Sequence, residues 1–313
     1  MTTLTLRADA GPGLGLGHLA RCVAYAEEAV NRGWQVNLIG DLVGGAGLRT
    51  RLRDLGVPVL PSECFPHIES DVVLIDHYGV GTVDRPFVVS MEDGPYGRRR
   101  ADVVVDCGLA PMARPDDGSP IVLTGPQFAP LRANVRAARV TRATNSGDAP
   151  ARVTVVMGGG DSTVAVEAAL TALRATGLPL DVLAVSTGEV RLPVPLPEQT
   201  FSQCGPRDDL PTVFANSDLV VSAAGVTMLE LCCIGVPMAV LTTAGNQRRT
   251  YTEAVRQGIA VGLGAIEDWD VSVAAHALSV ALRDPIAMRS VSTTAAATVD
   301  GEGARRVLDK IAR

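Results

Sequence analysis

Short apolar segments alternate with amphipathic, alanine-rich segments along the first half of the chain. Apolar clusters of strand length occupy positions 4–8, 34–40, 57–60, 71–76, 87–91 and 102–106. Helical periodicity occupies 18–31 and 45–55 instead. A strand that is followed by a helix returns to the sheet by a right-handed crossover, so the pattern predicts a parallel sheet.

The same pattern begins again near position 152. Strands are predicted at 152–157, 180–186, 219–222 and 237–242, and helices at 163–176, 208–215, 227–234 and 248–257. The segment 141–150 is polar, small and without periodicity, which is typical of a linker. We therefore predict an α/β protein of two Rossmann-like domains, at 1–145 and 151–313. Ligands of such sheets bind at the carboxyl ends of the strands, so the two domains are expected to face a central cleft.

Composition and charge exclude several classes of protein. The 313 residues carry a net charge of −6, which argues against a nucleic-acid partner because a polyanion needs a basic surface. No apolar run reaches the roughly 20 residues that span a bilayer, so no membrane association is expected. The six cysteines show neither CxxC pairs nor a metal-binding spacing. We expect a cytoplasmic protein with reduced thiols and no metal.

A glycine-rich loop after the first predicted strand is the first candidate site. It contains Gly15 and Gly17, and it leads directly into a helix that begins with His18 and includes Arg21. Glycines allow the backbone to approach a ligand, and a helix N-terminus attracts an anion such as a diphosphate. An imidazole beside a bound substrate is suited to general-base catalysis. The alternative is a tight turn followed by a histidine at a helix start.

A second candidate follows the apolar strand at 71–76. That strand ends in Asp76, His77 and Tyr78, three polar side chains at the edge where ligands bind. They could hold a sugar or a water molecule by hydrogen bonds. The alternative is a buried capping aspartate beside two surface rings.

The second half of the chain offers three loops for a nucleotide. One loop, Gly158, Gly159, Gly160 and Asp161, could form a nest of N–H groups for a pyrophosphate, or simply a flexible turn. In a second loop, Gly225 and Val226 lead into a predicted helix. On this helix, Thr227 could donate a hydrogen bond to a phosphate, and Glu230 could accept hydrogen bonds from a ribose. Alternatively, Thr227 and Glu230 form a capping box. The third loop carries Asn246 and Gln247.

Together these segments resemble one known family. The chain contains, in order, RADAGPGLGLGHLAR, LIDHYGV, MEDGPYGRRRADVVVDCG, LTGPQFAPLR, VVMGGGD, SAAGVTMLELCCIGVP and GNQ. This order is similar to the hydrolases that release the sugar from UDP-2,4-diacetamido-2,4,6-trideoxy-altrose in pseudaminic acid biosynthesis. That family belongs to the two-domain GT-B glycosyltransferase superfamily. SAAGVTMLE also looks like the nucleotide-binding segment of the peptidoglycan N-acetylglucosaminyltransferase.

The resemblance implies an inverting hydrolysis of a UDP-linked amino or deoxy sugar, without metal or cofactor. His18 matches the base that activates water, and Tyr78 matches a residue near the reacting sugar. Asp76 is expected to join them as a catalytic residue. Asn246 matches a polar position on the sugar side. Substrate contacts are expected from this residue and from five others in the candidate loops: Gly15, Gly17, Arg21, His77 and Gln247. Nucleotide contacts are expected from the residues that match the other side: Gly158, Gly159, Gly160, Asp161, Gly225, Val226, Thr227 and Glu230.

The chain also departs from that family. Ala223 and Ala224 stand where the hydrolases have serines, and Glu92-Asp93 replaces an Asp-Asp pair. An alternative is therefore an inverting glycosyltransferase that passes the sugar to a small soluble acceptor, because a base at His18 serves either nucleophile. A third alternative is a sugar-nucleotide binding protein that catalyses nothing. The sequence leaves the sugar, the nucleoside and the oligomeric state open.

Overall fold

The computed structural model describes residues 1–11, 13–142, 150–158 and 162–311. The chain divides into two compact units, which are described separately below. Unit 1 comprises Met1–Ala133 and Gly301–Arg313, and unit 2 comprises Asn134–Asp300.

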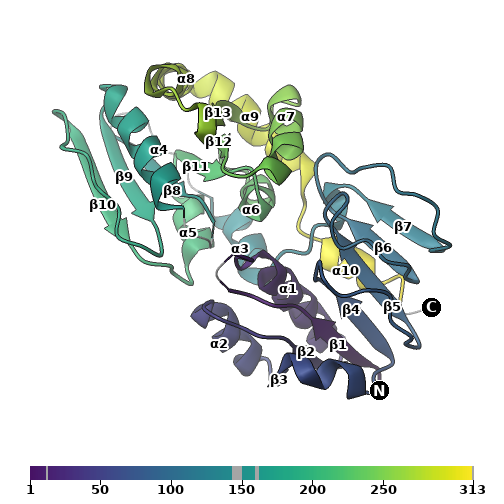
Figure 1. Ribbon diagram of the computed structural model, residues 1–313. Coiled ribbons are helices and arrows are strands. Elements are labelled where there is room, and N and C mark those ends of the chain that lie inside the picture. Colours follow the sequence, from purple (N-terminus) through teal and green to yellow (C-terminus); the bar gives the residue numbers. More distant parts are fainter. Residues whose placement is uncertain (12, 143–149, 159–161, 312–313) are drawn as a thin grey trace. The chain divides into compact units, whose positions relative to one another are not determined.

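A parallel sheet forms the centre of unit 1 (Figure 1). Its strands are β1 (Thr3–Arg7), β2 (Gln35–Ile39), β3 (Val59–Leu60), β4 (Val72–Ile75), β5 (Val88–Glu92), β6 (Val103–Asp106) and β7 (Ile121–Thr124). The order is β3-β2-β1-β4-β5-β6-β7, and every pair is parallel. The strand order reverses between β1 and β4, and ligands of doubly wound sheets bind at this point.

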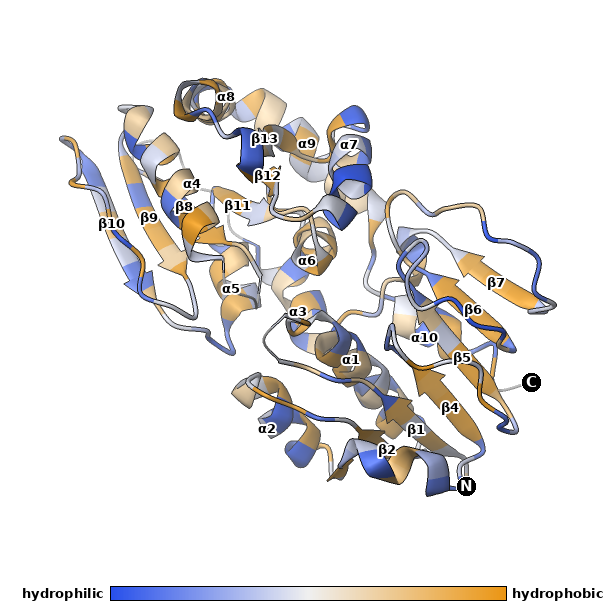
Figure 2. Cartoon of the chain, viewed as in Figure 1, coloured by the Kyte–Doolittle hydropathy of each residue, from blue (hydrophilic) through white to orange (hydrophobic). Residues whose placement is uncertain are grey.

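Different elements cover the two faces of this sheet. Helix α1 (Gly17–Asn31) packs on one face, where the Tyr25 hydroxyl donates to the sulfur of Met91 at 3.2 Å. On the other face, Phe65 of the 3-10 helix η1 (Ser62–His67) packs with Val73 and Ile75. Helix α2 (Ala46–Asp54) contacts α1. The strands of this sheet are among the most hydrophobic segments of unit 1 (Figure 2). This is expected for strands that are covered on both sides.

The connections between β4 and β7 contain no α-helix. Residues 76–87, 93–102 and 107–120 are all described, and none of them is α-helical. These segments are rich in glycine, proline and polar residues, which do not sustain an amphipathic helix. This part of the sheet is therefore covered by loops, and those loops carry much of the candidate site.

Unit 2 is built on a second parallel sheet. Its strands are β8 (Ala151–Val156), β9 (Leu180–Val185), β10 (Gln199–Cys204), β11 (Leu219–Ala223), β12 (Met238–Thr242) and β13 (Val261–Ala265). The order is β10-β9-β8-β11-β12-β13. The helices are α3 (Ala133–Thr141), α4 (Thr163–Ala175), α5 (Leu210–Ala215), α6 (Val226–Ile234), α7 (Arg248–Arg256), α8 (Val271–Arg283) and α9 (Pro285–Thr298). The two sheets thus share one topology.

The domain boundaries differ from the predicted 1–145 and 151–313. The division falls at Ala133, and the last residues of the chain belong to unit 1. The reason is helix α10 (Gly303–Leu308), which contacts α1 and the short helix η2 (Pro126–Phe128). An ion pair of 2.7 Å between Arg32 and Asp309 adds to this contact.

Several elements were not predicted at all. These are β7, β10, β13, α3, α9 and α10. Strand β10 lies in a stretch that we predicted to be a proline-rich loop, and α3 covers the beginning of the predicted linker. Residues 143–149 of that linker lie outside the described residues.

Candidate active site

The glycine-rich loop of unit 1 connects β1 to α1. Gly15 has φ +74°, a conformation that favours glycine, and an added Cβ there would meet open space. The backbone N–H of Gly15 donates to the carbonyl of Gly11 at 2.9 Å, so the loop folds back on itself. Helix α1 begins at Gly17, and His18 and Arg21 follow one turn apart on it. Their spacing of three residues places both side chains on one face of the helix.

His18 and Arg21 both contact Asp76, which directly follows β4. The distance from His18 Nδ1 to Asp76 Oδ1 is 2.6 Å. Arg21 binds the same carboxylate with two nitrogens, Nε to Oδ2 and Nη2 to Oδ1, each at 2.7 Å. All three side chains are buried. The sequence predicted each residue separately, and the neighbouring positions of β1 and β4 in the sheet bring them together.

The charge of Arg21 decides the protonation state of Asp76. Burial by itself would raise the pKa of this carboxyl, but the positive charge of Arg21 and the hydrogen bonds from His18 and Arg21 outweigh burial and lower the pKa to about 2. Asp76 is therefore ionised at neutral pH. Arg21 Nη2 also lies 3.0 Å from His18 Nδ1. A proton on Nδ1 would donate to the Asp76 carboxylate and leave Nε2 as the nitrogen that can accept a proton.

Asp93 joins this cluster from β5, and the sequence analysis gave it no role. Arg21 Nη1 lies 3.2 Å from Asp93 Oδ1, and the Tyr78 hydroxyl donates to Asp93 Oδ2. Burial and the charge of Asp93 raise the pKa of Tyr78, so the phenol stays protonated. The signal was present in the sequence, because Asp93 follows an apolar strand as Asp76 does.

Aromatic rings line the exposed side of the cluster. The rings of His18 and Tyr78 meet edge to face, with 4.6 Å between centroids. Tyr96 lies 5.6 Å from Tyr78. Tyr78 is 40% exposed and Tyr96 is 48% exposed, so both can meet a ligand. Exposed aromatic rings of this kind offer an apolar surface to the face of a sugar.

His77 points into a different network. Its Nδ1 accepts from the backbone N–H groups of Gly79, at 2.9 Å, and Val80, at 3.1 Å. Its Nε2 lies 2.9 Å from Asp9 Oδ2. Burial and the charge of Arg7 lower the pKa of His77. Both ring nitrogens thus serve the fold, and the substrate contact that the sequence predicts for His77 requires one of these bonds to open.

The predicted nucleotide loops of unit 2 follow neighbouring strands. Gly158, which follows β8, has φ +90° and is exposed. Gly159, Gly160 and Asp161 lie outside the described residues. Helix α6 follows β11 and begins at Val226 after Gly225, and no side chain caps it. The alternative capping box of Thr227 and Glu230 is therefore not formed.

The remaining predicted residues of unit 2 lie on α6 and after β12. Glu230 is 7% exposed, on the second turn of α6. Asn246 is exposed in the short helix η3 (Gly245–Gln247). Gln247 Oε1 accepts from the backbone N–H of Thr243 at 2.9 Å, which fixes this loop. Because β8, β11 and β12 are adjacent and parallel, all three loops share one edge of the second sheet.

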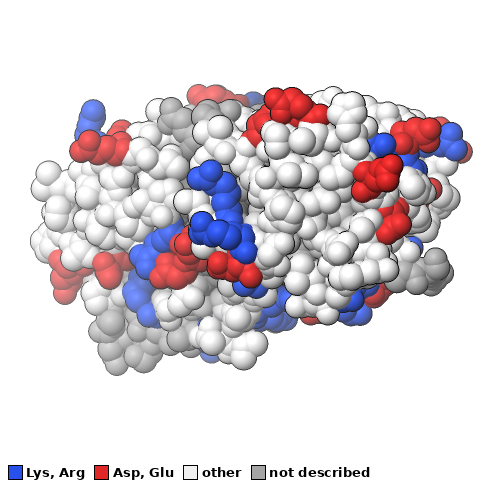
Figure 3. All heavy atoms as spheres, turned by 90° about the horizontal axis from the view of Figure 1, so that it is seen from below, with Lys and Arg blue, Asp and Glu red and all other residues white. Residues whose placement is uncertain are grey.

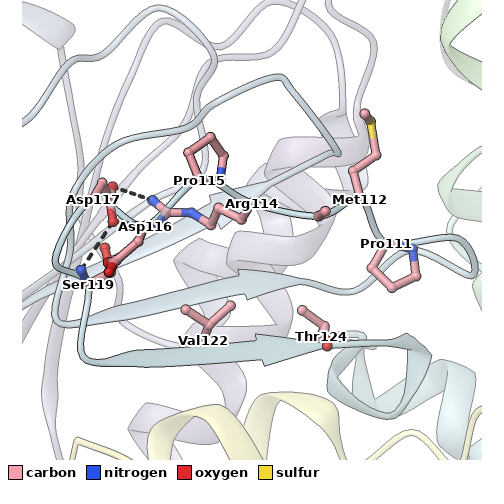
Figure 4. A pocket seen from close by; sticks show the side chains of 10 residues that line it. Pro111, Met112, Arg114, Pro115, Asp116, Asp117, Ser119, Val122 and Thr124 are labelled. Carbon is pink, nitrogen blue, oxygen red and sulfur yellow. Dashed lines mark hydrogen bonds and ion pairs between the residues drawn. The ribbon is translucent and has the colours of Figure 1, made fainter.

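A hollow of about 500 Å³ lies beside the loop after β6 in unit 1 (Figure 4). Pro111, Met112 and Val122 contribute apolar groups to its lining. Arg114 holds the loop in place through Asp117 and Glu92, the residue before Asp93. The volume lies within the range of small-molecule sites.

Three further features concern the charged surface, metal ions and the membrane. On the face drawn in Figure 3, basic and acidic side chains are interspersed, and no continuous basic surface is visible there. Among the described residues, no group of three or more His, Cys, Asp or Glu side chains is placed to hold a metal ion. Within the same residues, the helices are too short or too polar to cross a membrane.

No family model matches the chain, and no curated protein matches it. Solved structures, in contrast, match the chain over nearly its full length. MurG of Acinetobacter baumannii is 15% identical, with a TM-score of 0.65 and 99% of each chain covered. The spinosyn forosaminyltransferase SpnP is 12% identical, with a TM-score of 0.64 and full coverage of both chains. The spinosyn rhamnosyltransferase SpnG, solved with thymidine diphosphate, is 14% identical, with a TM-score of 0.64 and coverage of 99% of this chain and 100% of SpnG.

These similarities extend over both units. Two Rossmann-like units with parallel sheets, matched over nearly their full length, define a GT-B fold. This fold is the one that the sequence predicts. None of the three structures named above is a pseudaminic-acid-pathway hydrolase, the family that the sequence resembles.

Proposed function

We propose that this chain is an inverting enzyme that transfers a sugar from a nucleoside diphosphate to an acceptor, with His18 as the general base. The contact of 2.6 Å between His18 and the ionised Asp76 carries this proposal. A base needs a fixed ring and a free nitrogen that faces the substrate. Asp76 is proposed to fix the ring, Arg21 binds the Asp76 carboxylate with two nitrogens, and Nε2 is proposed as the nitrogen that takes the proton.

The proposed reaction is a single displacement. His18 Nε2 removes a proton from the acceptor hydroxyl or amine, and this atom attacks the anomeric carbon of the sugar. The bond between the anomeric carbon and the diphosphate oxygen breaks from the opposite face, so the configuration inverts. Asp76 stabilises the imidazolium that forms, because its carboxylate lies against Nδ1.

The nucleotide is proposed to bind to unit 2. Gly158, Gly225 and the start of α6 provide backbone N–H groups at the carboxyl edge of the sheet, which suits a diphosphate. Thr227 and Glu230 are proposed to contact phosphate and ribose. The sequence resemblance favours UDP, and the similar SpnG was solved with thymidine diphosphate.

The nucleophile is proposed to be an acceptor rather than water. SpnP and SpnG, which cover this chain fully or nearly so, are both titled as transferases. Unit 1 also has room for an acceptor, because the hollow at Met112 adjoins the turn after β5: an added Cβ at Gly94 would lie 3.2 Å from the Met112 sulfur. Hydrolysis is the second candidate, and the order of motifs that resembles the altrose hydrolases supports it.

The test is a donor panel. The purified protein with EDTA is incubated with UDP-, GDP- and TDP-sugars, with and without a mixture of hydroxyl and amine acceptors, and the products are followed by NMR. Transfer requires nucleoside diphosphate release that depends on an acceptor and yields an inverted glycoside. Inverted free sugar without an acceptor establishes hydrolysis instead. Absence of both products, together with no thermal stabilisation by any nucleotide, overturns the proposal.

His18→Gln then tests the base. We expect kcat to fall about 100-fold or more while the nucleotide still binds, because glutamine cannot accept the proton. His276→Gln is the matched control, since His276 is exposed on α8 of unit 2. Equal activity of His18→Gln and the control contradicts the mechanism.

A further inference from the structure

Arg99 is a buried cation next to the candidate active site, in the loop between β5 and β6. Its side chain is buried, and the whole residue is 4% exposed. Nε donates to the carbonyl of Val80 at 2.9 Å, and Nη1 donates to the carbonyl of Ile75 at 3.3 Å and to Ser90 Oγ at 2.7 Å. Nη2 donates to the carbonyl of His77. Four oxygens, three of them from residues 75–80, thus surround one guanidinium group.

Two of these carbonyl groups have a special position. The carbonyl of Ile75 belongs to the peptide bond that precedes Asp76, and the carbonyl of His77 belongs to the peptide bond that precedes Tyr78. We infer that Arg99 is a positioning residue, which fixes the backbone from which Asp76 and Tyr78 project toward His18. This inference rests on the proposed function, in which Asp76 orients the base.

Arg99 is itself held from both sides. Its backbone carbonyl accepts from Arg114 Nη2 at 2.7 Å. Ser90, which is fully buried, receives one bond from Arg99 and donates to the carbonyl of Gly97 at 3.4 Å. A Cβ at Gly97 would lie 3.4 Å from the Tyr78 ring and 3.7 Å from Arg99 Nη2. The guanidinium group and the ring of Tyr78 therefore lie close to the same glycine.

The shape of the guanidinium group explains why arginine occupies this place. Its donors point in fixed directions within one plane, so a single side chain reaches carbonyl groups on different peptides. Burial lowers the pKa of Arg99, while the charges of Glu92 and Asp76 oppose this effect, and the group stays protonated. A lysine ammonium is compact and cannot span the same set of oxygens.

The test compares Arg99→Lys with Arg100→Lys. Arg100 is the matched control because it is the next residue and is exposed. With the donor that the panel identifies, we expect Arg99→Lys to lower kcat about 10- to 100-fold with little change in the KM of the donor, because a small displacement of reacting groups costs rate rather than binding. In Arg99→Ala, added guanidinium ions at millimolar concentration should restore part of kcat, and potassium ions should not. Equal kcat values for the two lysine variants overturn the inference.

Hydrogen exchange tests the inference without any turnover. Peptides that cover residues 76–80 should take up deuterium about tenfold faster in Arg99→Lys than in the wild type or in Arg100→Lys, while those from β1 stay unchanged. If no donor in the panel reacts and no nucleotide stabilises the protein, the proposed function fails, and this measurement still decides the role of Arg99. If Arg99→Lys does not fold, Ser90→Ala removes one of the four acceptors and serves in both assays. Unchanged uptake at 76–80 overturns the inference.

Discussion

Asp76 is the residue on which the cluster of unit 1 depends. Its carboxylate accepts from Arg21 twice and faces His18, and it is 1% exposed. A buried charge is tolerated only when partners such as these satisfy it. Its proposed role in orienting a base and its contribution to stability therefore depend on the same contacts.

The lowered pKa of Asp76 predicts a specific dependence of stability on pH. The folded-state pKa is about 2, below the value of roughly 3.9 in an unfolded chain, so the stabilisation is fully present above about pH 4 and is lost as the pH falls toward 2. We expect Asp76→Asn to reduce the free energy of unfolding by about 1–3 kcal/mol at neutral pH. The difference between wild type and variant, measured by urea denaturation, should shrink below pH 4. A difference that is the same at pH 7 and pH 3 contradicts this account.

Tyr78 contacts the cluster through its ring and through its hydroxyl, and two variants can measure these contributions separately. Tyr78→Phe removes the bond to Asp93 but keeps the edge-to-face contact with His18. We expect kcat/KM to fall about tenfold or less, the effect of one hydrogen bond to a charged group, and Tyr78→Ala to cost more. Because the pKa of Tyr78 is raised, the wild type should show no phenol ionisation in its activity up to about pH 10. Equal losses in both variants would assign the whole effect to the hydroxyl.

At the scale of elements, the loop after β5 depends on a glycine. Gly97 has φ +76°, and an added Cβ would lie 3.0 Å from the carbonyl oxygen of Met91 and 3.4 Å from the Tyr78 ring. Gly33 in the same unit has φ +74°, and an added Cβ there would meet nothing within 4 Å. Alanine at Gly33 would introduce backbone strain alone, whereas alanine at Gly97 would introduce the same strain and a steric clash.

Gly97→Ala and Gly33→Ala form a matched pair. We expect Gly33→Ala to cost about 1 kcal/mol of unfolding free energy, the cost of a left-handed conformation. Gly97→Ala should cost about 1–3 kcal/mol more, because the clash moves the loop. It should also lower kcat, which Gly33→Ala should not. Urea denaturation and the donor assay measure both effects, and equal stability of the two variants refutes the argument.

At the scale of the whole molecule, the chain returns to unit 1 after completing unit 2. Helix α10 contacts η2 so closely that a Cβ at Gly303 would lie 2.2 Å from the carbonyl oxygen of Ala129. Only a residue without a side chain allows this approach. The C-terminal helix is thus part of the first unit, although it is more than 160 residues away in the sequence from the rest of that unit.

Gly303→Ala tests this contact. We expect a loss of about 2 kcal/mol or more of unfolding free energy, because α10 must shift away from η2. Arg305→Ala on the exposed side of α10 is the control and should change stability by no more than about 0.5 kcal/mol. Thermal unfolding with limited proteolysis of the C-terminus measures both. Wild-type stability of Gly303→Ala would show that α10 is not docked in this way.

Local patterns accounted for most of the sheets and for part of the candidate site. Buried strands such as β4 and β11 were predicted from short apolar runs, and His18 and Asp76 from their places after such strands. Strand β10 and Asp93 were missed. An edge strand with exposed residues lacks a continuous apolar run, and the role of Asp93 depends on partners 72 and 15 residues away.

The sequence by itself determined two parallel sheets, their glycine loops and the polar residues at their carboxyl edges, because periodicity and turn chemistry act over a few residues. Only the tertiary structure decided that α10 joins unit 1. The tertiary structure also decided that Arg21 binds both Asp76 and Asp93. It likewise decided that Arg99 donates hydrogen bonds to three backbone carbonyl groups in the segment 75–80. These features are contacts between residues far apart along the chain, and the strand order brings them within reach.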